Sequence, residues 1–71
     1  MKLGDIVEEK GCKFRKQGLI GRIVKPVKRD DSYVWIIPRN DDFLKTLAVN
    51  GHPIGILKSN IIKVNGKPKG E

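Results

Sequence analysis

The apolar residues of this chain come in runs of five or fewer, and this pattern limits what the chain can fold into. The runs are rich in isoleucine and valine, which favour pleated strands. Glycine, proline, asparagine and aspartate interrupt them, and no apolar spacing of 3.6 residues is sustained as in a long helix. Short strands at close spacing, with turn residues between them, predict a small all-β barrel.

The expected strands follow these runs. We expect strands over residues 4–9, 18–27, 33–37 and 61–64, with Pro26 at the end or edge of the second strand and Pro38 closing the third. Asn50-Gly51 predicts a two-residue hairpin turn with residues 47–49 and 54–57 as its arms, because both turn residues tolerate a positive φ. Residues 40–42 predict a turn or the cap of one helical turn. The predicted fold is therefore all-β, a five-stranded barrel over residues 1–64 with short helical turns at most, followed by a flexible basic tail over residues 65–71.

Length and cysteine content narrow the class of protein further. Seventy-one residues allow one small domain. Cys12 is the single cysteine, so we expect no disulfide framework, no cysteine-based metal site and a reducing compartment. No apolar run approaches the roughly 18 residues of a membrane span. These observations lead us to expect a cytoplasmic monomer with no cofactor, no metal and no membrane partner.

Basic residues give the first indication of function. Fifteen lysines and arginines against eight acidic residues give a net charge of +7. Residues 10–29 carry eight basic residues and no acidic one, which is typical of a surface that binds phosphates. We expect these eight to contact nucleic acid: Lys10, Lys13, Arg15, Lys16, Arg22, Lys25, Lys28 and Arg29.

Trp35 is the ninth candidate binding residue. Tyr33 and Trp35 share one face of their predicted strand, and Val34 and Ile36 share the other. If Val34 and Ile36 face inward, Trp35 is exposed and can stack on unpaired bases. If they face outward, Trp35 belongs to the core, which its usual burial in proteins favours.

Residues 11–24 resemble a KOW motif. They begin with a glycine, carry the motif's key glycine ten residues later at Gly21, and continue into an alternating strand. Residues 4–7 and 57–64 are similar to the opening and closing segments of SH3-like barrels of this kind. The resemblance implies an SH3-like barrel, and such barrels bind RNA or partner proteins in ribosomes and transcription-elongation factors.

The residues that catalysis requires do not come together in the sequence. His52 is the single histidine, and it lies beside a predicted turn with no nucleophile or carboxylate placed to act with it. We therefore expect a non-catalytic module that binds RNA or single-stranded DNA. The alternative is a basic docking subunit or adapter that binds an acidic protein in a larger assembly.

Overall fold

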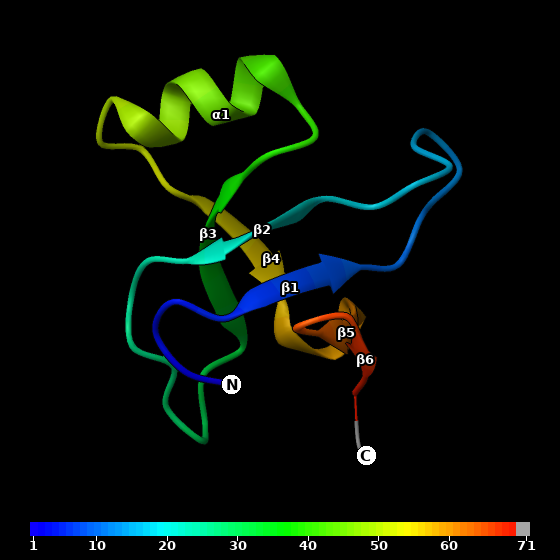
Figure 1. Ribbon diagram of the computed structural model, residues 1–71, viewed down its shortest axis with the longest axis vertical. Coiled ribbons are helices and arrows are strands. Elements are labelled where there is room, and N and C mark those ends of the chain that lie inside the picture. Colours follow the sequence, from blue (N-terminus) through cyan, green and yellow to red (C-terminus); the bar gives the residue numbers. More distant parts are fainter. Residues whose placement is uncertain (70–71) are drawn as a thin grey trace.

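One antiparallel sheet forms most of the molecule (Figure 1). The computed structural model describes residues 1–69. Its strands are β1 (Ile6–Glu9), β2 (Ile20–Ile23), β3 (Tyr33–Pro38), β4 (Ile54–Leu57), β5 (Ile61–Val64) and β6 (Lys67–Pro68). Its helices are α1 (Asp42–Val49) and the single 3₁₀ turn η1 (Lys58–Asn60). The predicted all-β class is confirmed, but the described chain has six strands in the order β4-β3-β2-β1-β5-β6.

The short connection between β4 and β5 requires the sheet to curl. In a flat sheet, β4 and β5 would lie four strand intervals apart, which is about 19 Å. Leu57 ends β4 and Ile61 begins β5, so four residue steps must span that gap. Four steps reach at most about 14 Å even when fully extended, and three of these residues form the tighter η1 turn. The sheet therefore bends strongly between its two sides, and its concave face encloses the core.

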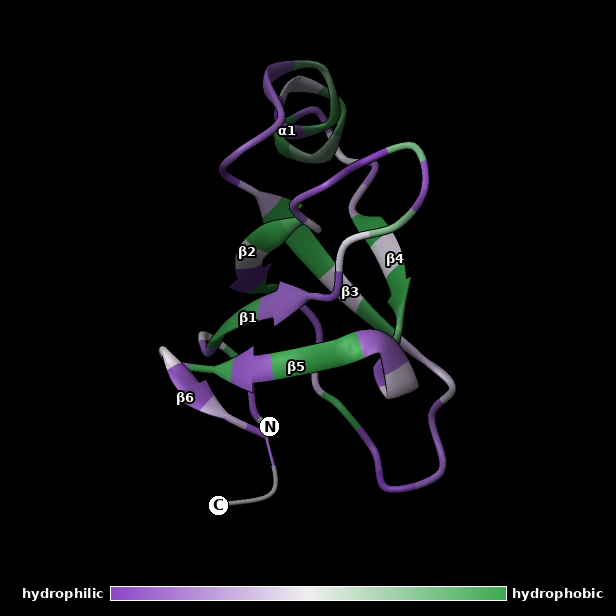
Figure 2. Ribbon diagram, turned by 90° about the vertical axis from the view of Figure 1, so that its right-hand side faces the viewer, coloured by the Kyte–Doolittle hydropathy of each residue, from purple (hydrophilic) through white to green (hydrophobic). Residues whose placement is uncertain are grey.

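The core consists of the inward side chains of the curled sheet. Along β3, burial alternates so that Val34 and Ile36 are completely buried while Tyr33 and Trp35 face outward. Figure 2 shows the apolar colour on much of β3, β4, β5 and α1, and the hydrophilic colour on the end of β1, on β6 and along much of the loops. The buried apolar residues packed together on the inner face are Val7, Leu19, Ile23, Val34, Ile36, Ile56 and Ile61.

Gly21 lies where β2 packs most tightly against β3. It pairs with Val7 on one side and Pro38 on the other, and it is buried. A Cβ atom at this position would lie 2.5 Å from the carbonyl oxygen of Ile37 and 2.9 Å from the Cα of Pro38. Close backbone approach, rather than a positive φ, is therefore the reason for glycine here.

The predicted hairpin at Asn50-Gly51 is wrong. Its first arm, residues 47–49, is the last turn of α1, and β4 pairs with β3 instead. Asn50 has a φ of −84°, whereas a type I′ turn needs positive φ at both central residues. Gly51 has a φ of +100° and ends the helix, because its N–H donates to Ala48 and that of His52 donates to Leu47. This is a Schellman ending, which also favours Asn-Gly.

An Asn-Gly hairpin turn occurs instead at Asn65-Gly66. These residues have φ values of +53° and +78°, and they connect β5 to β6. The Asn65 side chain also accepts a hydrogen bond from the backbone of Ile6 on β1. Residues 65–68 thus form a turn and a short strand paired with β5, where we expected a frayed tail. Residues 70–71 of that predicted tail lie outside the described chain.

Two further boundaries differ from the expectation. The predicted second strand over residues 18–27 is shortened to Ile20–Ile23, and Pro26 lies beyond its end. The predicted helical turn after residues 40–42 extends to the eight residues of α1, capped by Asp41, whose side chain accepts a hydrogen bond from the backbone of Leu44. The helix packs against β3 at one end of the sheet (Figure 1).

Candidate nucleic-acid interface

The predicted basic residues occupy two separate regions at opposite ends of β2 (Figure 1). The 10–19 loop precedes β2, and the 24–32 loop follows it. Arg22 lies between them on the exposed face of β2. The closeness of these residues in the sequence suggested a single basic surface, but β2 separates the two loops in space. The residues divide as Lys10, Lys13, Arg15 and Lys16 in the first loop and Lys25, Lys28 and Arg29 in the second.

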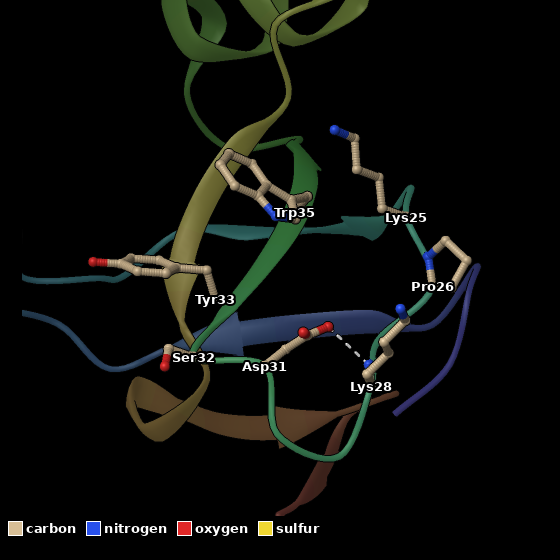
Figure 3. A pocket seen from close by; sticks show the side chains of 7 residues that line it. All are labelled: Lys25, Pro26, Lys28, Asp31, Ser32, Tyr33 and Trp35. Carbon is tan, nitrogen blue, oxygen red and sulfur yellow. Dashed lines mark hydrogen bonds between the residues drawn. The ribbon is translucent and has the colours of Figure 1, made fainter.

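An open groove lies where the 24–32 loop meets the outer face of β3 (Figure 3). It has a volume of about 510 Å³. Aromatic rings, ammonium groups and one carboxylate come together in this space. Its lining residues are Lys25, Pro26, Lys28, Asp31, Ser32, Tyr33 and Trp35.

Trp35 is exposed to this groove, so of the two alternatives left open by the sequence the outward-facing one holds and the core placement does not. Its side chain is 40% exposed, because Val34 and Ile36 take the inward positions of β3. Gly55 lies opposite Trp35 on β4, and a Cβ at Gly55 would be 3.0 Å from the indole ring. The missing side chain of Gly55 thus lets the ring lie close against β4.

Two aromatic rings form a row along β3. Tyr33 is 51% exposed, and its ring centroid lies 6.5 Å from that of Trp35 with a 35° angle between the planes. The Lys25 Nζ atom lies over the indole, 5.3 Å from its centroid, in a cation–π contact. The groove therefore combines two stacking surfaces with a cation placed directly above one of them.

Hydrogen bonds hold the 24–32 loop in place. The Lys28 N–H donates to Asp31 Oδ2 at 2.8 Å and closes a turn within the loop. The Lys58 ammonium donates to the carbonyl oxygens of Lys28 and Arg29, both at 3.1 Å, from the η1 turn. Sequence analysis did not identify Lys58, because its partners are backbone atoms about thirty positions away.

The 10–19 loop is braced differently. Cys12 and Arg15 exchange backbone hydrogen bonds of 2.6 and 3.1 Å around the tip, where Phe14 is 91% exposed. The Arg15 guanidinium forms an ion pair of 2.9 Å with Asp41 Oδ2. The Leu44 N–H and this guanidinium hold the pKa of Asp41 below its usual value of 3.8. Arg15 is thus engaged in fixing the loop to the start of α1.

A smaller basic depression lies on the outer face beside Arg22. It has a volume of about 210 Å³ and includes Arg39 and Lys45, which sequence analysis did not single out. Arg39 directly follows β3, and Lys45 lies on α1. Arg22 pairs across the sheet with Ile37, so cross-strand register brings it to the end of β3. The alternation of side chains along β3 predicts which residues lie on its outward face. The sequence does not predict where α1 packs, and therefore does not place Lys45 in this depression.

Two searches of the described residues concern metal-ligand clusters and membrane-spanning helices. Within residues 1–69, no three His, Cys, Asp or Glu side chains cluster as metal ligands would. Across this same range, α1 and η1 are both too short to cross a bilayer as helices.

Comparisons with protein-family models, with curated proteins and with solved structures find no match to this chain. The interpretation of the groove therefore depends on its own chemistry.

Proposed function

We propose that the protein is a non-catalytic module that binds single-stranded nucleic acid along the outer face of β3. The observation that carries this proposal is the pair of exposed aromatic rings, Tyr33 and Trp35, beside Lys25 and Lys28 in one open groove. Unpaired bases stack on such rings, with each base contributing about 1–3 kcal/mol. The neighbouring ammonium groups supply the contacts to phosphate that dominate nucleic-acid affinity.

A single strand fits this groove better than a duplex. Base stacking on Tyr33 or Trp35 requires an unpaired base whose face is accessible. The one α-helix of the described chain has eight residues and begins with Asp42 after the Asp41 cap, so its first turn carries negative charge. A duplex reader would present a cationic helix or ribbon to the groove of the nucleic acid.

The same proposal includes the finer fold assignment, an SH3-like barrel of the KOW type. The curled sheet and the resemblance of residues 11–24 support it. In this arrangement Gly21 occupies the tightly packed position described above, opposite Pro38. The strands then act as a scaffold, and binding specificity resides in the loops and the outer face of β3.

Matched lysine pairs provide the test of the groove. A fluorescently labelled oligouridine is titrated with the protein, and anisotropy is followed at several salt concentrations. We expect micromolar affinity near physiological salt, typical of contacts dominated by phosphate. The double variant Lys25→Gln/Lys28→Gln should bind more weakly and lose up to about two units of salt slope, one for each lost phosphate contact. The variant Lys13→Gln/Lys16→Gln removes the same charge from the 10–19 loop and should retain most of the affinity.

Aromatic variants separate stacking from charge. Tyr33→Ala should weaken binding without changing the salt slope, because it removes a stacking surface and no cation. Phe14→Ala, which removes an exposed ring from the other loop, is its control and should bind like the wild type. Equal losses for the two lysine pairs would contradict the placement of the site. Absence of any binding at millimolar oligonucleotide would overturn the proposal and favour an acidic protein partner, which titration with a polyglutamate peptide would then examine.

A further inference from the structure

The carboxylate of Asp31 is the unexpected component of the groove. A negative charge beside Lys25 and Lys28 opposes the binding of phosphate. Figure 3 shows the Asp31 carboxylate pointing into the space between Trp35 and Lys28. Its Oδ2 accepts the Lys28 N–H, while no residue within 1–69 donates a hydrogen bond to its Oδ1. Oδ2 therefore closes the loop but keeps a further lone pair, and Oδ1 keeps both of its own, so both oxygens can accept from a ligand.

An ionised carboxylate only accepts hydrogen bonds, so it selects ligands with donors. Among the four bases of RNA, guanine alone carries two adjacent donors on its Watson–Crick edge, N1–H and the N2 amino group. Adenine and cytosine place a ring acceptor beside their amino group, and uracil places a carbonyl on each side of its single N–H. A carboxylate and guanine can therefore form two parallel hydrogen bonds, and charge-assisted bonds of this kind are the strong ones.

We propose that the groove prefers an unpaired guanine, stacked on Trp35 and bound through its Watson–Crick edge by Asp31. This inference rests on the proposed function and adds a base preference to it. The two oxygens of Asp31 have enough lone pairs to hold the Lys28 N–H and the guanine donors together. In the free protein the Lys25 ammonium covers the indole at 5.3 Å. Stacking of the base displaces this ammonium from the ring and leaves it free to contact a flanking phosphate.

The base preference is measured with oligouridines that carry one central guanosine, adenosine or inosine. Adenosine is the stacking control, because it is also a purine but lacks the paired donors. We expect the guanosine strand to bind on the order of tenfold more tightly than the adenosine strand, the discrimination that a bidentate contact gives. Inosine keeps N1–H and lacks the N2 amino group, so its affinity should fall between the two. This comparison uses the wild-type protein and does not depend on how a variant folds.

Two variants of neighbouring residues assign the preference to Asp31. Asp31→Asn should abolish the preference for guanosine, because an amide cannot accept two parallel hydrogen bonds. Asp30→Asn makes the same charge change at an exposed neighbour outside the groove lining and should retain the preference. Chemical-shift spectra of both variants report whether the 24–32 loop keeps its structure.

The possible results distinguish this inference from the proposed function. Loss of the guanosine preference in Asp31→Asn alone supports the assignment. Equal binding of all strands by the wild type, with Tyr33→Ala still weakening it, overturns the guanine preference and leaves the proposed function in place. A preference that persists in Asp31→Asn overturns the role of this carboxylate. Failure of every strand to bind overturns the proposed function, and the guanine preference fails with it.

Discussion

The 10–19 loop and the 24–32 loop are both basic and leave opposite ends of β2, but their basic side chains make different contacts. In the 24–32 loop, Lys25 and Lys28 lie beside the rings of Tyr33 and Trp35, and the Trp35 ring lies against Gly55 of β4. In the 10–19 loop, Arg15 is paired with Asp41, and the Lys13 ammonium lies over the exposed ring of Phe14. The comparison teaches that a run of positive charge in a sequence does not define one surface, because a strand of even four residues separates its two ends.

Replacement of Gly21 by valine should have the largest effect, because β2 is the spacer that holds the two loops apart. A valine Cβ would collide with the backbone of β3 at Ile37. We expect a loss of about 3 kcal/mol or more in the free energy of unfolding, measured by chemical denaturation. Arg22→Val places the same side chain on the exposed face of β2 and is the control. Equal denaturation midpoints for Gly21→Val and the wild type would refute the packing argument.

Removal of the Lys58 ammonium should loosen the 24–32 loop and leave the 10–19 loop unchanged. Lys58→Met keeps the length of the side chain and loses both hydrogen bonds to the loop carbonyls. We expect a loss on the order of 1 kcal/mol in stability and faster amide exchange over residues 28–31. Oligonucleotide affinity should fall with no change in salt slope. Lys63→Met, at an exposed lysine of β5, is the control; similar exchange in both variants would exclude this role for Lys58.

Acid should release the brace of the 10–19 loop. The Leu44 N–H and Arg15 lower the folded pKa of Asp41, so the carboxylate stabilises the folded state above pH 3.8. This contribution is lost as the pH falls through the folded pKa. Asp41→Asn can still cap α1 but cannot pair with Arg15. The thermal midpoint of the wild type should therefore exceed that of Asp41→Asn at neutral pH. The difference should shrink below pH 3.8 and vanish once the pH is below the lowered folded pKa; a difference that grows in acid would contradict the ion pair.

The smallest effect is expected for the lysines of the 10–19 loop. Lys13 and Lys16 are exposed, and neither makes a hydrogen bond or ion pair through its ammonium within residues 1–69. Lys13→Ala and Lys16→Ala should each change stability by no more than about 0.5 kcal/mol. Thermal denaturation of these two variants and of Lys58→Met compares the stability changes at the two loops directly. A larger loss at Lys13 or Lys16 than at Lys58 would reverse the comparison between the loops.

Most of the strands could be predicted because short runs rich in isoleucine and valine lie between turn residues. In β3 the alternation also gave the correct relation between Trp35 and Val34, although the usual burial of tryptophan favoured the wrong side. The segment before Asn50-Gly51 was misassigned because three apolar residues fit a strand or a helical turn equally well. Asn-Gly ends helices as well as closing hairpins. Residues 40–42 carried the signal for the helix through the Asp41 cap.

The sequence predicted several residues of the candidate site but not how they are arranged in space. The nine candidate residues include both groove lysines and Trp35, but the sequence could not divide them between two ends of a strand. Lys58 and Asp31 escaped attention because their importance comes from contacts and directions in space. Lys58 binds carbonyl oxygens, which every residue possesses, so no pattern of side chains marks its partners. The role that we propose for Asp31 depends on which hydrogen bonds its oxygens already accept.

The pairing of β1 with β5 has a consequence for the order in which the chain folds. Strands β1 to β3 pair as successive neighbours, so each can form soon after the one before it. Val7 and Val64 lie opposite each other with nearly the whole chain between them, and closing so long a loop carries a large entropic cost. Contacts of this separation slow folding. We therefore expect β5 to dock late, so that one edge of β1 remains unpaired until β5 joins the sheet.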